Sequence, residues 1–234
     1  MTCAALLGVA ATVSLGRWQL SRAAQKEALQ AAIEERQAMP PLTGAEWTDQ
    51  EPATLLHRPV VLKGRLDAEH TVFLDNRQMH GRPGFYVLTP LKLEHSAAAV
   101  IVQRGWVPRN FVDRAALPKI ATPDGVVEIE GRIAPAPAKL FEFEGHEAGR
   151  IRQNLDLAAF GSETGLALLP LSILQTEGES DDGLLRDWPA PALGVEKHYG
   201  YAFQWFGLCS LIVFLYVWFQ FIQPRRSARA TRNA

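Results

Sequence analysis

Between Tyr199 and Ile222 the chain has 24 consecutive residues without a charge, YGYAFQWFGLCSLIVFLYVWFQFI. As a helix that rises 1.5 Å per residue, this segment is about 36 Å long, which exceeds the bilayer hydrocarbon thickness of about 30 Å. Aromatic residues are concentrated at both of its ends, where amphipathic rings favour the level of the lipid headgroups. We therefore predict a transmembrane helix over residues 199–222.

A second uncharged segment covers residues 1–16 and is followed by Arg17 and Trp18. Sixteen helical residues span only about 24 Å, but Arg17 can extend its charge to the interface and Trp18 can lie there, which lengthens the usable segment. We predict a first transmembrane helix over residues 1–18. A cleaved signal peptide is the alternative, which we disfavour because the segment has no basic leader and no clear small-x-small cleavage site.

The charges beside these spans predict their orientation. The tail over residues 223–234 contains four arginines and no acidic residue. Positive residues next to a span remain on the cytoplasmic side, or on the matrix side in a mitochondrion. We expect a multi-pass protein of the bacterial inner membrane with both termini cytoplasmic and the main domain periplasmic; the mitochondrial inner membrane is the alternative. In this orientation Arg17, Arg22 and Lys26 lie on the outer side of the first span, which conflicts with the simple form of the positive-inside rule.

Residues 19–39 are rich in Ala, Gln, Glu and Arg, which predicts a helical extension of the first span that Pro40 and Pro41 end. Residues 40–195 form the predicted extramembrane domain, in which apolar and polar residues alternate, as at Val60, Leu62, Gly64 and Leu66. We predict six strands, at residues 57–67, 70–78, 85–93, 97–108, 126–133 and 168–176. We also predict helical turns at residues 109–115 and 155–160 and a loop over 176–193. The expected fold is a membrane protein with two transmembrane helices flanking an antiparallel β-barrel or sandwich domain with minor helices.

Composition and motifs exclude several functions. The net charge of −1 gives no support to nucleic-acid binding. The sequence has no GxSxG, HExxH or phosphate-binding glycine loop, so we do not expect the protein to be an enzyme. Cys3 and Cys209 both lie in the apolar ends, which argues against a zinc site or a copper chaperone. In Asp75-Asn76-Arg77 and Arg104-Gly105-Trp106 we expect each arginine to bond loop carbonyls while Trp106 packs.

His198 stands one residue before the second span, at its outer end. An ionisable residue there can serve as an interfacial anchor, as the neighbouring Lys197 can. The other reading is haem ligation, because imidazole is a common axial ligand of haem iron. A haem needs an apolar surface, for which Tyr201 follows on the same helix, and cations for its propionates. Arg17 and Arg22 emerge at the same membrane face, so we expect a cofactor-binding site between the two outer helix ends.

Several motifs resemble those of the Surfeit-locus, or Shy-type, assembly factors of cytochrome c oxidase. They are Leu15-Gly16-Arg17-Trp18-Gln19-Leu20 with Arg22 and Lys26, Leu74-Asp75-Asn76-Arg77 with Gly84 and Val87-Leu88-Thr89-Pro90-Leu91, Val102-Gln103-Arg104-Gly105-Trp106-Val107-Pro108, and His198-Tyr199-Gly200-Tyr201-Ala202-Phe203-Gln204-Trp205-Phe206-Gly207. They occur in the family's order and cover nearly the whole chain. Two departures concern the binding site: Val195-Glu196-Lys197 replace an Asn-rich run, and Gln204 replaces a usual threonine.

The resemblance implies an assembly factor that binds haem a transiently and aids its insertion into oxidase subunit I. It ties His198 to the haem iron, with Arg17, Arg22, Trp18 and Tyr201 as further cofactor-binding residues. It implies subunit I, haem a synthase and membrane lipid as partners, and no nucleic acid. A structural chaperone that stabilises subunit I and never binds haem is the alternative.

Overall fold

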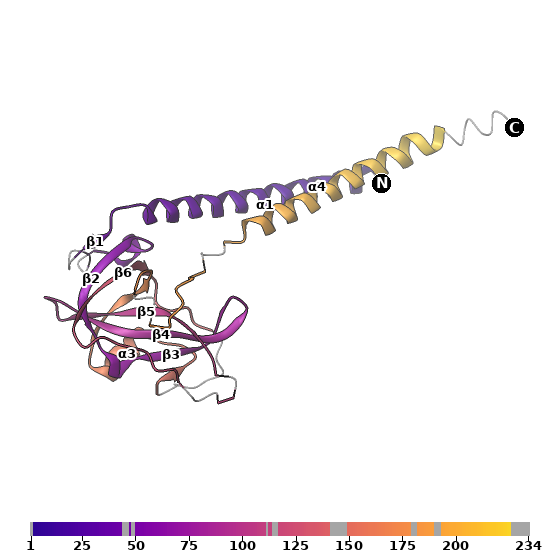
Figure 1. Ribbon diagram of the computed structural model, residues 1–234. Coiled ribbons are helices and arrows are strands. Elements are labelled where there is room, and N and C mark those ends of the chain that lie inside the picture. The colour runs from indigo at the N-terminus through magenta and orange to yellow at the C-terminus, as the bar shows by residue number, and fades with distance from the viewer. Residues whose placement is uncertain are drawn as a thin grey trace. The chain divides into compact units, whose positions relative to one another are not determined.

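The computed structural model describes residues 2–43, 47, 50–110, 112–113, 117–140, 149–178, 182–189 and 193–225. The chain divides into two units, which are described separately (Figure 1). A helical unit comprises residues 1–32 and 191–234, and a β-rich unit comprises residues 33–190.

Two long helices make up the helical unit. Helix α1 runs without interruption over Thr2–Gln37, and helix α4 over Val195–Val217 continues into the π-helical turn η2 over Trp218–Ile222. Both helices are long and apolar enough to cross a membrane by length and composition. Helix α4 begins four residues before the predicted span, and the membrane boundary predicted at residue 18 falls inside one continuous helix. Of the predicted basic tail, only residues 223–225 are described, and they continue the helix.

Small residues bring α1 and α4 into direct contact (Figure 1). A Cβ atom on Gly16 would lie 2.8 Å from Cζ of Phe206, and one on Gly8 would lie 3.3 Å from Cδ1 of Ile212. Thr12, one turn from each glycine, is 5% exposed. The helices therefore pack along a stripe in which glycine on α1 accommodates a large side chain on α4.

The β-rich unit contains one mixed sheet of eight strands. Its strands are β1 (Leu42–Thr43), β2 (Pro59–Leu66), β3 (Val72–Met79), β4 (Arg82–Leu93), β5 (Ala98–Pro108), β6 (Val126–Ala134), β7 (Ile151–Arg152) and β8 (Ala167–Gln175). Its helices are α2 (Pro52–Leu55), the 3-10 turn η1 (Ala68–His70) and α3 (Leu157–Thr164).

Five of these strands close into a barrel. The sheet order is β1-β2-β6-β8-β5-β4-β3-β7, and β2 also pairs with β4, so β2, β6, β8, β5 and β4 form a ring. Strand β4 serves both the barrel and its extension, because its first part pairs with β3 and its last residues pair with β2. The prediction of a barrel or sandwich domain is thus resolved in favour of a barrel with a sheet extension.

The predicted alternation holds inside the barrel. Val60, Leu62 and Leu66 of β2 are buried in one core cluster with Ile129 and Ile133 of β6. A second cluster lies under α3, where Leu157 and Phe160 pack with Leu74 of β3 and Leu88 of β4. Asp156 caps α3 by accepting bonds from the N–H groups of Ala158 and Ala159, which fixes where this helix begins.

Two predictions about this unit were wrong. The sheet is mixed and not antiparallel, because β5 and β8 pair in parallel. The chain crosses from β6 to β8 through β7 and α3. Strand β8 then runs antiparallel to β6 and parallel to β5. The helical turn predicted at residues 109–115 is absent at Arg109, Asn110, Val112 and Asp113. There the Asn110 side chain accepts hydrogen bonds from the N–H groups of Val112 and Asp113 instead. Its other members lie outside the described residues.

The predicted corner contacts are confirmed. Arg77 donates hydrogen bonds to the carbonyl oxygens of Ala138 and Gln153. Trp106 donates its indole N–H to the carbonyl of Arg77 at 2.9 Å, and a Cβ atom on Gly84 would lie 2.5 Å from the Trp106 ring. The glycine therefore leaves the space that the tryptophan fills.

Asp67, at the end of β2, gives the unit a stabilising contact that depends on pH. Its side chain is 8% exposed and lies 2.7 Å from Lys92 Nζ and 3.1 Å from His70 Nδ1. Burial alone raises the pKa of Asp67, but the hydrogen bond from Lys92 and the effect of His70 outweigh it and hold the pKa below its usual value. A depressed folded-state pKa adds stability that is present above the unfolded pKa of about 3.9 and is lost as the pH falls through the folded pKa.

We predict that Asp67→Asn lowers the free energy of unfolding by about 1 kcal/mol at neutral pH, because the charge is mostly buried while Lys92 is half exposed. The difference from the wild type should shrink as the pH falls below about 4, and should be smallest below the folded-state pKa, where the wild-type carboxylate is protonated in both states. Denaturant unfolding of the full chain in detergent at both pH values measures this. Glu128→Gln, which breaks the exposed pair with Lys63, is the control and should change little. An equal deficit at both pH values would contradict the prediction.

For the helical unit we predict that Gly16→Leu separates α1 from α4, because the new side chain would occupy the position of the Phe206 ring. Gly207→Leu is the matched control, since a Cβ atom there meets nothing within 4 Å. Spin labels at the exposed positions Leu6 and Phe214, on a background lacking Cys3 and Cys209, report the helix separation by pulsed electron resonance. The distance distribution should widen in Gly16→Leu alone; a wide distribution in both variants, or in neither, would refute the packing argument.

Candidate functional site

The histidine singled out in the sequence lies against the first helix. His198, in the first turn of α4, has its Nδ1 atom 2.7 Å from Oε1 of Gln19 on α1. An amide oxygen only accepts hydrogen bonds, so in the neutral imidazole this contact places the hydrogen on Nδ1. The other nitrogen, Nε2, then carries a free lone pair, which is the form in which histidine binds a metal ion.

Two further contacts join the helices near this pair. The Tyr199 hydroxyl donates to Oε1 of Glu27 at 2.8 Å, and the Lys26 ammonium donates to the carbonyl of Leu193 at 2.5 Å. Leu193 lies just before α4, so Lys26 fixes the start of that helix. The three contacts, at Gln19, Lys26 and Glu27, hold His198 in place against α1. We call this group of contacts the His198 network.

The stripe that packs against α4 explains which residues of α1 join this network. Thr12, Gly16 and Ala23 are buried, Gln19 and Lys26 are half-buried, and the spacing of three and four residues places all five on one face of the helix. The small residues provide the close approach, and the polar members, Gln19 and Lys26, provide the hydrogen bonds.

Among the cations proposed from the sequence, Arg22 lies near His198 and Arg17 does not share its face. The charges of Lys26 and Arg22 act on the imidazole. The Arg22 guanidinium bonds the side chain of Gln25, three residues later, and remains exposed. Arg17 is exposed and lies about 160° around the helix from Gln19, at 100° per residue, on the side away from α4.

Two aromatic residues proposed for the site are exposed. Trp18 is 54% exposed and Tyr201 is 53% exposed, and neither belongs to the His198 network. Their open faces are available to lipid or to a ligand.

Sequence reasoning missed the residues that hold the histidine. Gln19 was quoted as part of a motif but given no role, and Glu27 was not considered. The available signal was the recurrence of small residues on α1 at the spacing of Gly8, Thr12, Gly16 and Ala23, which predicts a face for close helix packing. Gln19 lies on that face, where a polar side chain requires a partner.

Chemically, this arrangement can hold a metal-centred ligand. His198 supplies a neutral imidazole with a fixed tautomer, and Arg22 and Lys26 supply positive charge within reach of an anionic group. These features fit a haem, which needs an axial nitrogen ligand and cations for its propionates. When bound, a haem would bring iron to Nε2 of His198.

Comparisons with known proteins cover nearly all of the chain. A family model described as the SURF1 family matches residues 6–210. A SURF1-like protein of Rickettsia bellii is 26% identical over 216 residues, which cover 87% of this chain and 84% of that protein. Surfeit locus protein 1 of Xenopus tropicalis is 25% identical over 228 residues, covering 90% and 73% of the two chains.

A third relative carries a functional name. The cytochrome oxidase assembly protein SHY1 of Saccharomyces cerevisiae is 28% identical over 99 residues, which cover 42% of this chain and 25% of the yeast protein. The resemblance identified from the motifs is confirmed by these matches, and the region that the family model covers includes Gln19, both corner motifs and His198. With this fold and these matches, the chain belongs to the SURF1 family.

Proposed function

We propose that this protein is a cytochrome c oxidase assembly factor that holds haem a through His198 and delivers it to oxidase subunit I. Membership of the SURF1 family and the name of the yeast relative support the assembly role. The observation that carries the haem assignment is the bond from His198 Nδ1 to Gln19, which leaves Nε2 available as an axial ligand. The role is non-enzymatic, and haem a synthase and subunit I are the partners.

The exposed apolar surface of both helices supports anchorage in a membrane. Leu6 and Leu7 of α1 and Phe203 of α4 are between 64% and 79% exposed. Apolar patches of this kind are costly in water and are expected to face lipid. With the basic tail in the cytoplasm, the His198 network lies at the periplasmic end of the two spans. Relatives occur in a bacterium and in a eukaryote. For a mitochondrial member of the family, the corresponding location is the mitochondrial inner membrane.

Positive charge near His198 supports the binding of the haem carboxylates. Arg22 has one described side-chain bond, to Gln25 on the exposed surface, and its remaining donors are available. We assign Arg22 as the first propionate partner. Arg17 takes this role only if the haem extends around α1. A haem in that position would also contact Trp18.

The test is the haem a content of the protein purified from cells that make haem a. We expect the wild type to carry haem with an absorption spectrum of histidine ligation, and His198→Ala to lose most of it, because the iron loses its ligand. His95→Asn is the matched control: His95 lies in a turn of the β-rich unit with a φ of 60°, which asparagine tolerates, and the haem content should not change.

Unchanged haem content in His198→Ala would refute ligation by this residue. If the purified wild type contains no haem and still restores oxidase assembly in a deletion strain, the protein is a structural chaperone of subunit I. These two results separate the haem proposal from the assembly role.

We predict that Gln19→Leu weakens haem binding by about 10- to 100-fold, because His198 loses the acceptor that sets its tautomer. Gln37→Leu, at the end of the same helix and outside the network, is the control. Titration of haem into the apo-protein, followed by absorbance, measures both dissociation constants. Equal affinities of Gln19→Leu and the wild type would show that the acceptor contributes nothing to ligation.

A further inference from the structure

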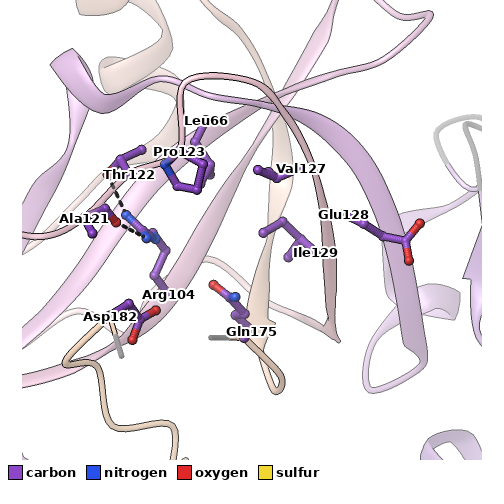
Figure 2. A pocket seen from close by; sticks show the side chains of 11 residues that line it. Leu66, Arg104, Ala121, Thr122, Pro123, Val127, Glu128, Ile129, Gln175 and Asp182 are labelled. Atoms are coloured by element: carbon purple, nitrogen blue, oxygen red, sulfur yellow. Dashed lines mark hydrogen bonds between the residues drawn. The ribbon is translucent and has the colours of Figure 1, made fainter. Parts of the chain in front are cut away.

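One end of the barrel encloses a cavity that the proposed haem site does not use. Strands β2, β5 and β8 end at this mouth and β6 begins there, because β6 is antiparallel to both β2 and β8, and β5 is parallel to β8. The cavity has a volume of about 700 Å³, within the range typical of small-molecule sites. It is lined by Leu66, Arg104, Ala121, Thr122, Pro123, Val127, Glu128, Ile129, Gln175, Gly178 and Asp182 (Figure 2). We call it the barrel-mouth pocket.

Two polar side chains occupy positions that are apolar elsewhere in the barrel. Arg104 continues the inward-facing positions Val100 and Val102 of β5, and Gln175 follows the inward-facing Ile173 of β8. They are only 3% and 6% exposed. Burying a guanidinium and an amide at the end of an apolar core is costly unless they have partners.

The described residues satisfy these two groups only in part. Arg104 donates to the Thr122 hydroxyl at 2.8 Å and to the carbonyl of Ala121 at 2.7 Å, as Figure 2 shows. Its Nε has no partner among the described residues, and neither has Oε1 of Gln175, whose Nε2 donates to the carbonyl of Glu177. The pocket wall therefore has an unused donor and an unused acceptor.

The buried charge of Arg104 has no ion-pair partner of its own among the described residues. Asp182 and Arg186 are the charged groups that act on Arg104, and they pair with each other through two contacts while only 10% and 11% of their side chains are exposed. Asp182 lines the pocket and Arg186 does not. Because Asp182 pairs with Arg186, no described carboxylate forms an ion pair with Arg104. Burial lowers the pKa of Arg104, which reflects the cost of holding its charge away from water.

Opposite this polar wall the pocket is apolar. Leu66, Val127 and Ile129 form that side, and Pro123 closes over it. Glu128 points away from the hollow in Figure 2, and its carboxylate lies 3.2 Å from Lys63 Nζ. The described part of the pocket thus combines an apolar surface with one unused donor, on Arg104, and one unused acceptor, on Gln175.

We propose that the barrel-mouth pocket binds an apolar organic molecule that carries a carboxylate with an N–H or O–H donor beside it. The carboxylate would receive a hydrogen bond from Arg104 and neutralise the charge of its guanidinium. The neighbouring donor would bond Oε1 of Gln175, and the apolar body would cover Val127 and Ile129. A free acid and the C-terminal residue of a polypeptide share this chemistry.

The test titrates N-acetylleucine, which has all three features, into the full-length protein in lipid nanodiscs, with ligand-observed NMR as readout and empty nanodiscs as blank. We expect saturable binding of N-acetylleucine, binding weaker by about tenfold or more for the uncharged N-acetylleucinamide, and an intermediate loss for 4-methylpentanoate, which lacks the N–H group. Equal binding of all three compounds, or no saturable binding of any, would overturn the proposal.

Matched variants locate the site. Val127→Trp fills the pocket and should abolish binding, whereas Val126→Trp, on the outward face of the same strand, should not. Gln175→Leu should weaken N-acetylleucine roughly tenfold and leave 4-methylpentanoate unaffected, and Gln78→Leu on the exposed face of β3 serves as its control. Thermal unfolding of each variant confirms that it is folded, and binding that survives Val127→Trp in a folded protein would overturn the proposal.

A last comparison distinguishes the two sources of the carboxylate. An acetylated tetrapeptide ending in leucine that binds more tightly than N-acetylleucine would identify a polypeptide C-terminus, because the added residues find further contacts outside the pocket. Equal or weaker binding of the peptide would identify a free acid. Neither result depends on haem, so His198→Ala should bind N-acetylleucine as the wild type does.

Discussion

The β-rich unit depends on the pairing between the end of β2 and the end of β4. Gly64 and Leu66 lie opposite Leu93 and Leu91, and this short ladder converts a curved sheet into a closed ring. Only glycine permits this approach, because a Cβ atom on Gly64 would lie 2.3 Å from the carbonyl oxygen of Lys92. Closure removes two strand edges from the barrel and fixes the residues that face its interior.

Closure also explains why the barrel has one polar end. The five strands cannot all pair with their neighbours along their full lengths: β6 pairs with β2 over Val126–Arg132 but with β8 only over Gly131–Ala134. The strands therefore diverge at the mouth, and the apolar core ends there. Arg104 and Gln175 fill the inward positions of the diverging strands, and the segment at residues 121–123 covers Arg104 through two hydrogen bonds. Because the mouth is wider than the core, longer side chains are needed to fill it.

The sequence predicted most of the β-strands because their alternation reports which side chains are buried. Six strands were placed to within a few residues, whereas β1 and β7, with two residues each, are too short to show a period. The parallel pairing of β5 and β8 was not predictable from alternation, which is identical in parallel and antiparallel strands. For the site, the position of His198 at the end of an apolar span was visible, but its partner Gln19 lies 179 residues away, and a pairing at that distance requires the fold.

The His198 network and the barrel mouth follow the same physical rule. In each, an apolar packing surface ends, and the next position on the buried face holds a polar side chain: Gln19 after Thr12 and Gly16 on α1, and Arg104 after Val100 and Val102 on β5. A polar group at such a position has lost much of its water but lies at the edge of the core, where a ligand can still reach it. Its orientation is fixed by the packed residues before it, so a ligand meets a preorganised partner and loses less entropy on binding. The polar ends of these apolar faces are therefore the places where a ligand loses little entropy when it binds.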